Sequence, residues 1–190
     1  LVDSADVLMH NIRPQKLANL GLDAETVRAR HPRIVYAGLG GFTATGRYAG
    51  RPAYDDIIQG MTGVADLVHR QTGEFRYAPM ALADKTCGIV AALAISAALM
   101  RREKTGEGVV IEGPMSETMV AFNMVENFAG SHFNELGVMG YSRTLAANRG
   151  PYRTQDGYIS FMPYTDQQWR SFFTAAGRED LAADPRFTDI

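Results

Sequence analysis

Asp84 is the residue whose type and position best suit it to chemistry. It stands in the sequence Ala81-Leu82-Ala83-Asp84-Lys85-Thr86, at the start of a long apolar segment. An aspartate here has two interpretations. It could cap a helix, since its oxygens accept hydrogen bonds from free N–H groups and the helix dipole stabilises its charge. Alternatively, a carboxylate held ionised and partly desolvated could act as a nucleophile toward an activated acyl group.

The other reactive side chains form no recognisable site. The histidines (His10, His31, His69 and His132) do not cluster in the sequence, and neither HxxxH nor HExxH occurs, so we expect no metal site. Cys87 is the single cysteine, and we expect it to pack as a small apolar residue. The chain contains no GxSxG, which excludes a serine nucleophile elbow.

A glycine-rich segment follows the second predicted strand, with glycines at 38, 40, 41 and 46. A glycine-rich loop at the carboxyl end of a parallel strand is where α/β folds bind ligands. The alternative is a flexible turn without a ligand. There is no GxGxxG before a helix and no Walker lysine, so the segment is not a nucleotide-binding fingerprint.

Hydrophobic periodicity and turn residues predict the elements that must position these groups. We expect strands at 5–10, 33–39 and 109–112, a β-hairpin at 151–163, and helices at 14–20, 24–30, 53–68, 84–103, 115–128 and 165–176. The 84–103 helix is apolar on every face from Ile89 to Met100, which predicts burial all round. Asp23 is a candidate cap for the 24–30 helix and Ser116 for the 115–128 helix.

The alternation of strands and helices predicts an α/β fold with a parallel sheet. The hairpin and helix after Asn148 change this rhythm, so we expect two domains, at 1–145 and 146–190. The second has the mixed pattern of a small α+β domain. Because a strand begins almost at Leu1 and no helix closes the other end, we expect the chain to be part of a longer polypeptide, truncated at both ends.

Composition narrows the classes of function. With 46% hydrophobic and 21% charged residues the chain is globular, and its net charge of −2 argues against nucleic-acid binding. A single cysteine fits a reducing compartment, and we expect a cytoplasmic protein. The longest apolar stretch, residues 86–100, falls short of the roughly 20 residues of a membrane span. Sixteen of the 19 basic residues are arginine. This excess reflects either codon bias or the use of the planar guanidinium group to bind phosphate and carboxylate groups through two hydrogen bonds.

Several motifs together resemble one family, the class III CoA-transferases, which include formyl-CoA:oxalate and carnitine CoA-transferases. The similarity covers essentially all 190 residues in the family's order. Its blocks are Asn11-Ile12-Arg13-Pro14, His31 to Tyr36, Gly41-Phe42, Thr45-Gly46, Arg51 to Asp55, Leu82-Ala83-Asp84, Arg102 with Thr105 to Gly108, Pro151 to Thr154, Asp156 to Tyr158 and Pro163 to Asp166.

The resemblance implies an incomplete Rossmann-like large domain and an enzyme that moves coenzyme A between an acyl-CoA and a carboxylic acid. Asp84 matches the family's nucleophile, which passes through aspartyl–acyl anhydride and aspartyl-CoA thioester intermediates. Coenzyme A is then a carrier substrate, and no cofactor is tightly bound. The positions that match the family's CoA contacts are Asn11, Ile12, Arg13, Arg51, Tyr54 and Asp55.

Two positions depart from the family's pattern. Asn19 replaces a basic residue that contacts a CoA phosphate, and residues 146–150 are less glycine-rich than the lid of the oxalate enzymes. The family also contains α-methylacyl-CoA racemases, whose catalytic histidine falls where this chain has Tyr54. We therefore favour transfer over racemisation, and keep a non-catalytic CoA-binding remnant as a third interpretation.

The resemblance also implies a partner. Members of the family fold as interlocked homodimers, so we expect a homodimer with an extensive interface, and no membrane partner. Because the family's chains are longer at both ends, we expect this piece alone to be inactive.

Overall fold

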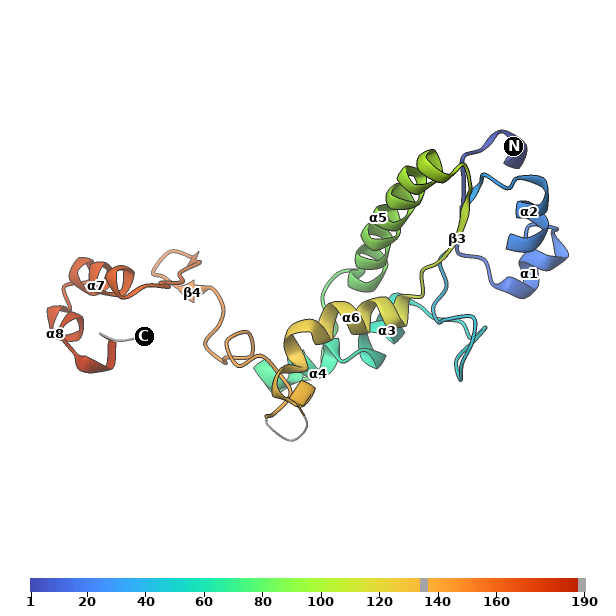
Figure 1. Ribbon diagram of the computed structural model, residues 1–190. Helices are drawn as coiled ribbons and strands as arrows, with labels where there is room; N and C mark the ends of the chain where they lie inside the picture. Colours follow the sequence, from blue (N-terminus) through green and yellow to red (C-terminus); the bar gives the residue numbers. More distant parts are fainter. Residues whose placement is uncertain (134–136, 188–190) are drawn as a thin grey trace. The chain divides into compact units, whose positions relative to one another are not determined.

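The computed structural model describes residues 1–133 and 137–187 (Figure 1). The chain forms two compact units, Leu1–Ala147 and Asn148–Ile190. The mixed α/β class expected from the sequence is confirmed. The assignment of the units to a large CoA-binding domain and the start of a small domain remains a prediction.

A parallel three-stranded sheet forms the frame of the first unit. Its strands are β1 (Val7–His10), β2 (Val35–Gly38) and β3 (Val109–Glu112), in the order β1-β2-β3. The register aligns His10 with Gly38 and Gly38 with Glu112. The carboxyl ends of all three strands therefore reach one edge, where ligands bind in open α/β sheets.

Short helices cover one side of this sheet: η1 (Val2–Ser4), α1 (Pro14–Asn19) and α2 (Ala24–Arg30). Pro14 occupies the first turn of α1, and Asp23 caps α2 by accepting a hydrogen bond from the Thr26 N–H at 2.9 Å, as expected. Val27, Ile34 and Tyr36 form the buried cluster between these helices and the sheet.

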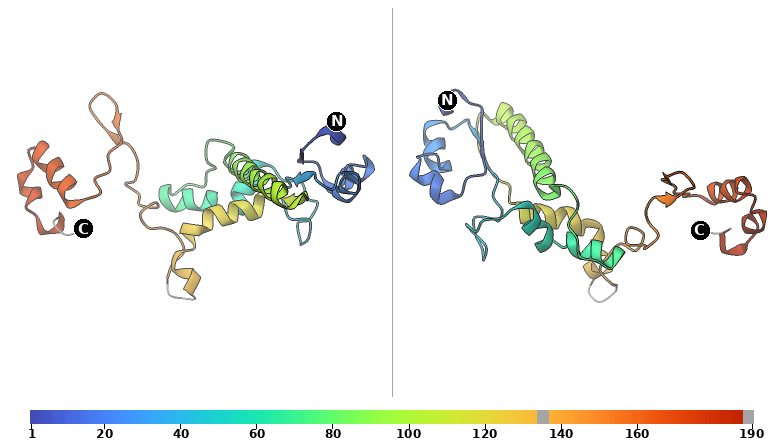
Figure 2. Two further views of the ribbon diagram at one scale, coloured as in Figure 1. Left: turned by 45° about the horizontal axis from the view of Figure 1, so that its top comes forward. Right: turned by 180° about the vertical axis from the view of Figure 1, so that it is seen from behind.

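The remaining helices of the first unit are α3 (Asp55–Met61), α4 (Val64–Thr72), α5 (Leu82–Thr105), α6 (Met115–Asn127) and η2 (Ala129–Phe133). Their shared core contains Ile58, Val64, Ala83 and Met119. Helix α5 runs along the sheet on the side opposite to α1 and α2, as seen in Figure 1 and in the view from behind in Figure 2. The sheet thus lies between two helical layers.

The prediction of one helix over 53–68 is wrong, because α3 ends at Met61 and α4 begins at Val64. Gly63 separates them with φ +87°, a left-handed conformation that glycine adopts without steric cost. The apolar period continues through this break, so periodicity alone did not reveal it.

The prediction that α5 is buried all round is also wrong. Only Ala83, Ala91 and Ala98 of this helix are buried, while Ile89 and Leu93 are 73% and 71% exposed. Alanines at this spacing allow close packing against the sheet and neighbouring helices on one face, whereas Ile89, Val90, Leu93 and Met100 stay exposed within the described residues. By length and composition alone α5, with 24 residues, could cross a membrane, a test that core helices of soluble proteins also pass.

The second unit begins with the expected hairpin, β4 (Tyr152–Arg153) paired antiparallel with β5 (Tyr158–Ile159). It continues with α7 (Asp166–Ala175), α8 (Glu179–Ala182) and η3 (Pro185–Phe187). Thr165 and Gln168 form a capping box at the start of α7. The aromatic rings of this unit pack together around the buried Phe173; they are Phe161, Trp169, Phe172, Phe173 and Phe187.

Candidate active site

A cavity of about 650 Å³ opens at the carboxyl edge of the sheet, within the first unit. This volume is typical of sites for small molecules and cofactors. All seven positions singled out in the sequence line it: Asn11, Ile12 and Arg13 after β1, Arg51 and Tyr54 before α3, Asp55 at the start of α3, and Asp84 in α5. The structure therefore brings together residues up to 73 positions apart in the sequence.

Asp84 does not cap α5, which corrects the first of its two interpretations. The helix begins at Leu82, and the capping position, Ala81, makes no side-chain hydrogen bond. Asp84 is the third helical residue, so its exposed side chain lies in the first turn, where the helix dipole favours negative charge. Among the described residues its carboxylate forms no hydrogen bond or ion pair, which leaves both oxygens available to a ligand.

Asp55 takes over the capping role from another helix. Its Oδ1 accepts a hydrogen bond from the Asp84 N–H at 2.9 Å, and its Oδ2 accepts one from the Gln59 side chain. Asp55 is also the first residue of α3. Its half-buried carboxylate therefore joins the N-terminal ends of α3 and α5, and both helix dipoles stabilise its charge.

The glycine-rich segment after β2 lines the cavity and is held in place by hydrogen bonds. The carbonyls of Gly40 and Gly41 accept hydrogen bonds from the Met115 and Ser116 N–H groups, at 2.8 and 3.0 Å. These carbonyls satisfy the start of α6, so Ser116 is not its cap; the capping position is Pro114. A side chain at Gly41 would overlap Ala53, with the two Cβ atoms 2.3 Å apart.

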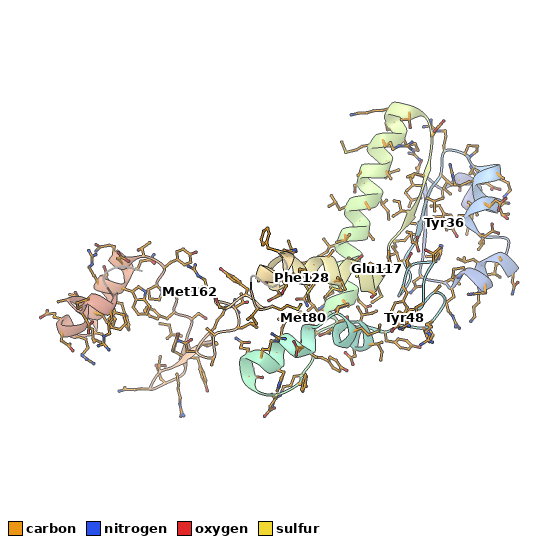
Figure 3. All side chains as sticks on the ribbon, turned by 60° about the horizontal axis from the view of Figure 1, so that its bottom comes forward. Tyr36, Tyr48, Met80, Glu117, Phe128 and Met162 are labelled. Carbon is orange, nitrogen blue, oxygen red and sulfur yellow. The ribbon has the colours of Figure 1, made fainter. Side chains whose placement is uncertain are left out.

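Two glutamates that the sequence analysis missed secure the same segment. Glu112, the last residue of β3, accepts hydrogen bonds from the Thr43 hydroxyl at 3.1 Å and from the Ala44 N–H. Glu117 in α6 accepts one from the Thr43 N–H at 3.3 Å (Figure 3). The position of Glu112 at the carboxyl end of a predicted strand was the signal that could have identified it.

His10 supports the chain at the end of β1. Its Nδ1 accepts a hydrogen bond from the Ile12 N–H at 3.2 Å, and its ring meets Tyr36 edge-on at 5.1 Å. Burial lowers the pKa of His10, so the ring is neutral at neutral pH. The Tyr36 hydroxyl donates to the Leu22 carbonyl at 2.8 Å, and burial raises the pKa of Tyr36.

Two exposed arginines, Arg13 and Arg51, line the cavity. Arg51 lies over the Tyr48 ring at 5.4 Å, and Tyr48 stacks on Phe42 at 5.2 Å (Figure 3). Arg13, after β1, forms no ion pair among the described residues. Arginines of this kind suit phosphate groups, which they bind through two parallel hydrogen bonds.

Cys87 lies one turn after Asp84 but takes no part in a reactive site. Its thiol is part-buried and contacts the Met115 carbonyl at 3.7 Å. Burial is the main cause of the raised pKa of the thiol, and the charges of Asp84 and Asp55 also raise it. A hydrogen bond with Thr118 acts in the opposite direction and lowers the pKa. The neutral thiol is a poor nucleophile. In residues 1–133 and 137–187 no three His, Cys, Asp or Glu side chains are grouped to hold a metal ion.

Comparison with known proteins assigns the chain to a family. The model of CoA-transferase family III matches residues 1–190, and the chain belongs to this family. It is 32% identical, over 194 residues, to a succinate–glutarate CoA-transferase of Agrobacterium fabrum; the match covers 98% of the chain and 47% of that protein. It is 31% identical, over 197 residues, to the acetyl-CoA:oxalate CoA-transferase of Acetobacter aceti, covering 100% of the chain and 49% of that protein.

Solved structures agree with this assignment. A CaiB/BaiF family protein from Brucella suis superposes with a TM-score of 0.78 at 33% identity, covering 98% of the chain and 50% of that protein. Rv3272 from M. tuberculosis superposes with a TM-score of 0.79 at 30% identity, covering 98% and 48%. The family resemblance found in the motifs is confirmed. The chain spans about half the length of these relatives.

Proposed function

We propose that the protein transfers coenzyme A from an acyl-CoA to a carboxylic acid, with Asp84 as the nucleophile. The observation that carries this proposal is the Asp84 carboxylate, which lines the cavity and has no hydrogen-bond partner in the described part of the chain, while the Asp84 N–H is held by Asp55. Family membership supports it, as do the names of the relatives, which are CoA-transferases for succinate, glutarate and oxalate.

The proposed reaction proceeds by covalent exchange. An Asp84 oxygen attacks the thioester carbonyl, the C–S bond breaks, and an aspartyl–acyl anhydride and CoA thiolate form. The thiolate attacks the Asp84 carbonyl carbon of the anhydride and releases the donor as its carboxylate, which leaves an aspartyl-CoA thioester. The acceptor carboxylate attacks this thioester, the C–S bond breaks, and a second aspartyl–acyl anhydride and the CoA thiolate form. The thiolate then attacks the acceptor carbonyl, giving the new acyl-CoA and restoring Asp84.

The energetics of the proposed exchange require no ATP. One thioester and one carboxylate are exchanged for another such pair, so the overall reaction is near thermoneutral. Each tetrahedral stage needs N–H donors aimed at the oxyanion. The Met115 and Ser116 N–H groups already donate to the carbonyls of Gly40 and Gly41, so in the proposed mechanism other donors stabilise the oxyanion.

In this proposal, residues around Asp84 bind coenzyme A. We assign the CoA contacts to Asn11, Ile12, Arg13, Arg51, Tyr54 and Asp55, which line the cavity. Arg13 and Arg51 carry the charge that CoA phosphates require. Asn19 is uncharged, whereas the family has a basic residue at this position, so we assign the phosphate contacts to these two arginines.

Racemisation is the alternative. It needs an acid–base pair across the α-carbon, and Tyr54 stands at the position of the racemase histidine. The third interpretation is a CoA-binding remnant without turnover.

The test uses the intact protein with an acyl-CoA. Transfer predicts an adduct on Asp84 that hydroxylamine traps and mass spectrometry locates, and Asp84→Asn abolishes turnover. Full activity in Asp84→Asn would refute the proposal. Exchange of the α-proton in deuterated water without movement of CoA would identify a racemase, and CoA binding without either reaction would identify the remnant.

We further propose a cytoplasmic homodimer in which the whole protein, rather than this chain alone, is active. The apolar side chains exposed on α5, such as Ile89 and Leu93, support an interface with other polypeptide. Light scattering of the intact protein tests the homodimer, and a monodisperse monomer would contradict it. Fractionation of source cells tests the location, and turnover by residues 1–190 alone would contradict the proposed inactivity.

A further inference from the structure

A fully buried glutamine lies behind the cavity wall. Gln59 in α3 has no exposed surface, and a buried amide is tolerated only where its hydrogen bonds are made. Its Oε1 accepts a hydrogen bond from the Ala78 N–H at 2.9 Å. Its Nε2 donates to the Met80 carbonyl at 3.2 Å and to Asp55 Oδ2. Both Nε2 hydrogens are therefore used.

The three partners fix the orientation of this amide. The Ala78 N–H can only donate, whereas the Met80 carbonyl and the Asp55 carboxylate can only accept. Oε1 must therefore face Ala78, and Nε2 must face the other two groups. An amide meets this set of partners and a carboxylate does not, which makes glutamine the required residue type.

Gln59 reaches Asp84 along two routes. Through Asp55, the amide fixes the carboxylate whose other oxygen holds the Asp84 N–H at 2.9 Å. Through Ala78 and Met80, it fixes the segment that leads into α5, where the Leu82 N–H donates to the Met80 carbonyl at 2.8 Å (Figure 3). Both routes end in the first turn of α5.

We infer that Gln59 is a positioning residue for the Asp84 nucleophile. It is not among the residues that line the cavity, so it acts on Asp84 through its neighbours. It sets the direction in which the first turn of α5 presents Asp84, through one carboxylate and one backbone segment. This inference rests on the proposed function, in which Asp84 attacks a thioester.

The first variant is Gln59→Met, which keeps the length of the side chain and removes its hydrogen bonds. A misplacement of about 1 Å costs on the order of 100-fold in rate. We therefore expect kcat to fall by about 10- to 100-fold and the Asp84 adduct to form more slowly by the same factor. KM for the acyl-CoA should change less than kcat, because within the described residues Asp55 is the only one of the assigned CoA-binding residues that is hydrogen-bonded to Gln59.

Thr62→Val is the matched control. Thr62 is also buried, just past the end of the same helix, but among residues 1–133 and 137–187 its hydroxyl bonds only to the Ile58 carbonyl, at 2.7 Å, and not to Asp55. This substitution also removes one buried polar group, so it reports the effect of lost stability alone. We expect its kcat to stay close to that of the wild type.

A polarity exchange provides the second test. Asp55→Asn sets two amide donors against each other, and Gln59→Glu sets two carboxylates against each other. The double variant restores an amide and a carboxylate at the contact between positions 55 and 59, and leaves an oxygen to accept from the Asp84 N–H. It lacks the hydrogen bond to the Met80 carbonyl, so activity should recover only in part. We expect the kcat of the double variant to exceed that of either single variant.

The outcomes separate this inference from the proposed function. Full activity of Asp84→Asn would refute the proposed function itself. If Asp84 is essential but Gln59→Met retains wild-type kcat, or loses no more than Thr62→Val, the positioning role of Gln59 is refuted. If Gln59→Met does not fold, the polarity exchange decides: a double variant no more active than the single variants overturns the inference.

Discussion

Replacement of Gly41 by alanine tests whether hydrogen bonds hold the glycine-rich segment in a fixed position beside the cavity. The added Cβ would stand 2.3 Å from the Ala53 Cβ, whereas non-bonded carbons prefer about 3.5–4.0 Å. The segment cannot simply swing away, because the Gly41 carbonyl is bonded to the Ser116 N–H at 3.0 Å. Either this tether or the start of α3 must therefore move by more than about 1 Å.

The magnitudes follow from this overlap. Overpacking of this kind costs about 1–3 kcal/mol of the free energy of unfolding. Ala53 directly precedes Tyr54 and Asp55, so a displacement of about 1 Å there would lower kcat by on the order of 100-fold. Urea denaturation measures the first effect, and steady-state acyl transfer by the intact protein measures the second.

Two further variants make the prediction decisive. Gly88→Ala adds the same methyl group to α5, one turn after Asp84, where no atom lies within 4 Å. It should stabilise the protein by about 0.5–1 kcal/mol, as an alanine in a helix does. Adding Ala53→Gly to Gly41→Ala removes the overlap, leaving a nearest approach of 3.5 Å, and should recover most of the loss. Wild-type stability in Gly41→Ala, or no recovery in the double variant, would refute the reasoning.

Three more predictions concern other contacts. Arg102→Ala removes an almost buried guanidinium that pairs with Asp6 at 3.0 Å, so urea denaturation should show that the free energy of unfolding falls by about 1–3 kcal/mol. Arg101 is exposed, so Arg101→Ala should change this free energy little. Equal effects of the two substitutions would contradict the prediction. Because the pKa of His10 is lowered in the folded state, the unfolded state binds more protons below about pH 6.5; the stability that neutral His10 provides is present above that pH and is lost as the pH falls through the folded pKa. His10→Gln should flatten this part of the pH–stability curve, and an unchanged slope would contradict it. The raised pKa of Cys87 predicts alkylation by iodoacetamide more slowly than in the urea-unfolded chain, and equal rates would contradict it.

Local patterns were sufficient where neighbours in the sequence determine the structure. The three strands, the β-hairpin within 151–163 and the Asp23 cap depend on residues within a few positions, and all three features were predicted. The family was also recognised correctly, because its motifs survive as short blocks such as Leu82-Ala83-Asp84.

Features set by distant residues escaped prediction. The bond between Asp55 and Asp84 spans 29 positions and depends on two helices meeting at their first turns. The exposure of α5 depends on what packs against it, which its own composition cannot reveal. The break at Gly63 was hidden because the apolar period continues across it, although the glycine itself was visible.

The sheet register has a consequence for changes in chain length. His10, Gly38 and Glu112 end their strands side by side, and each is followed by a segment of the cavity wall. One residue inserted into a strand would advance the following segment by about 3.3 Å and turn each shifted side chain to the opposite face. The turn at Thr154–Gly157 joins only two short strands of exposed residues. Insertions, tags and circular permutation belong at that turn, whereas the three strands admit changes of residue type but not of length.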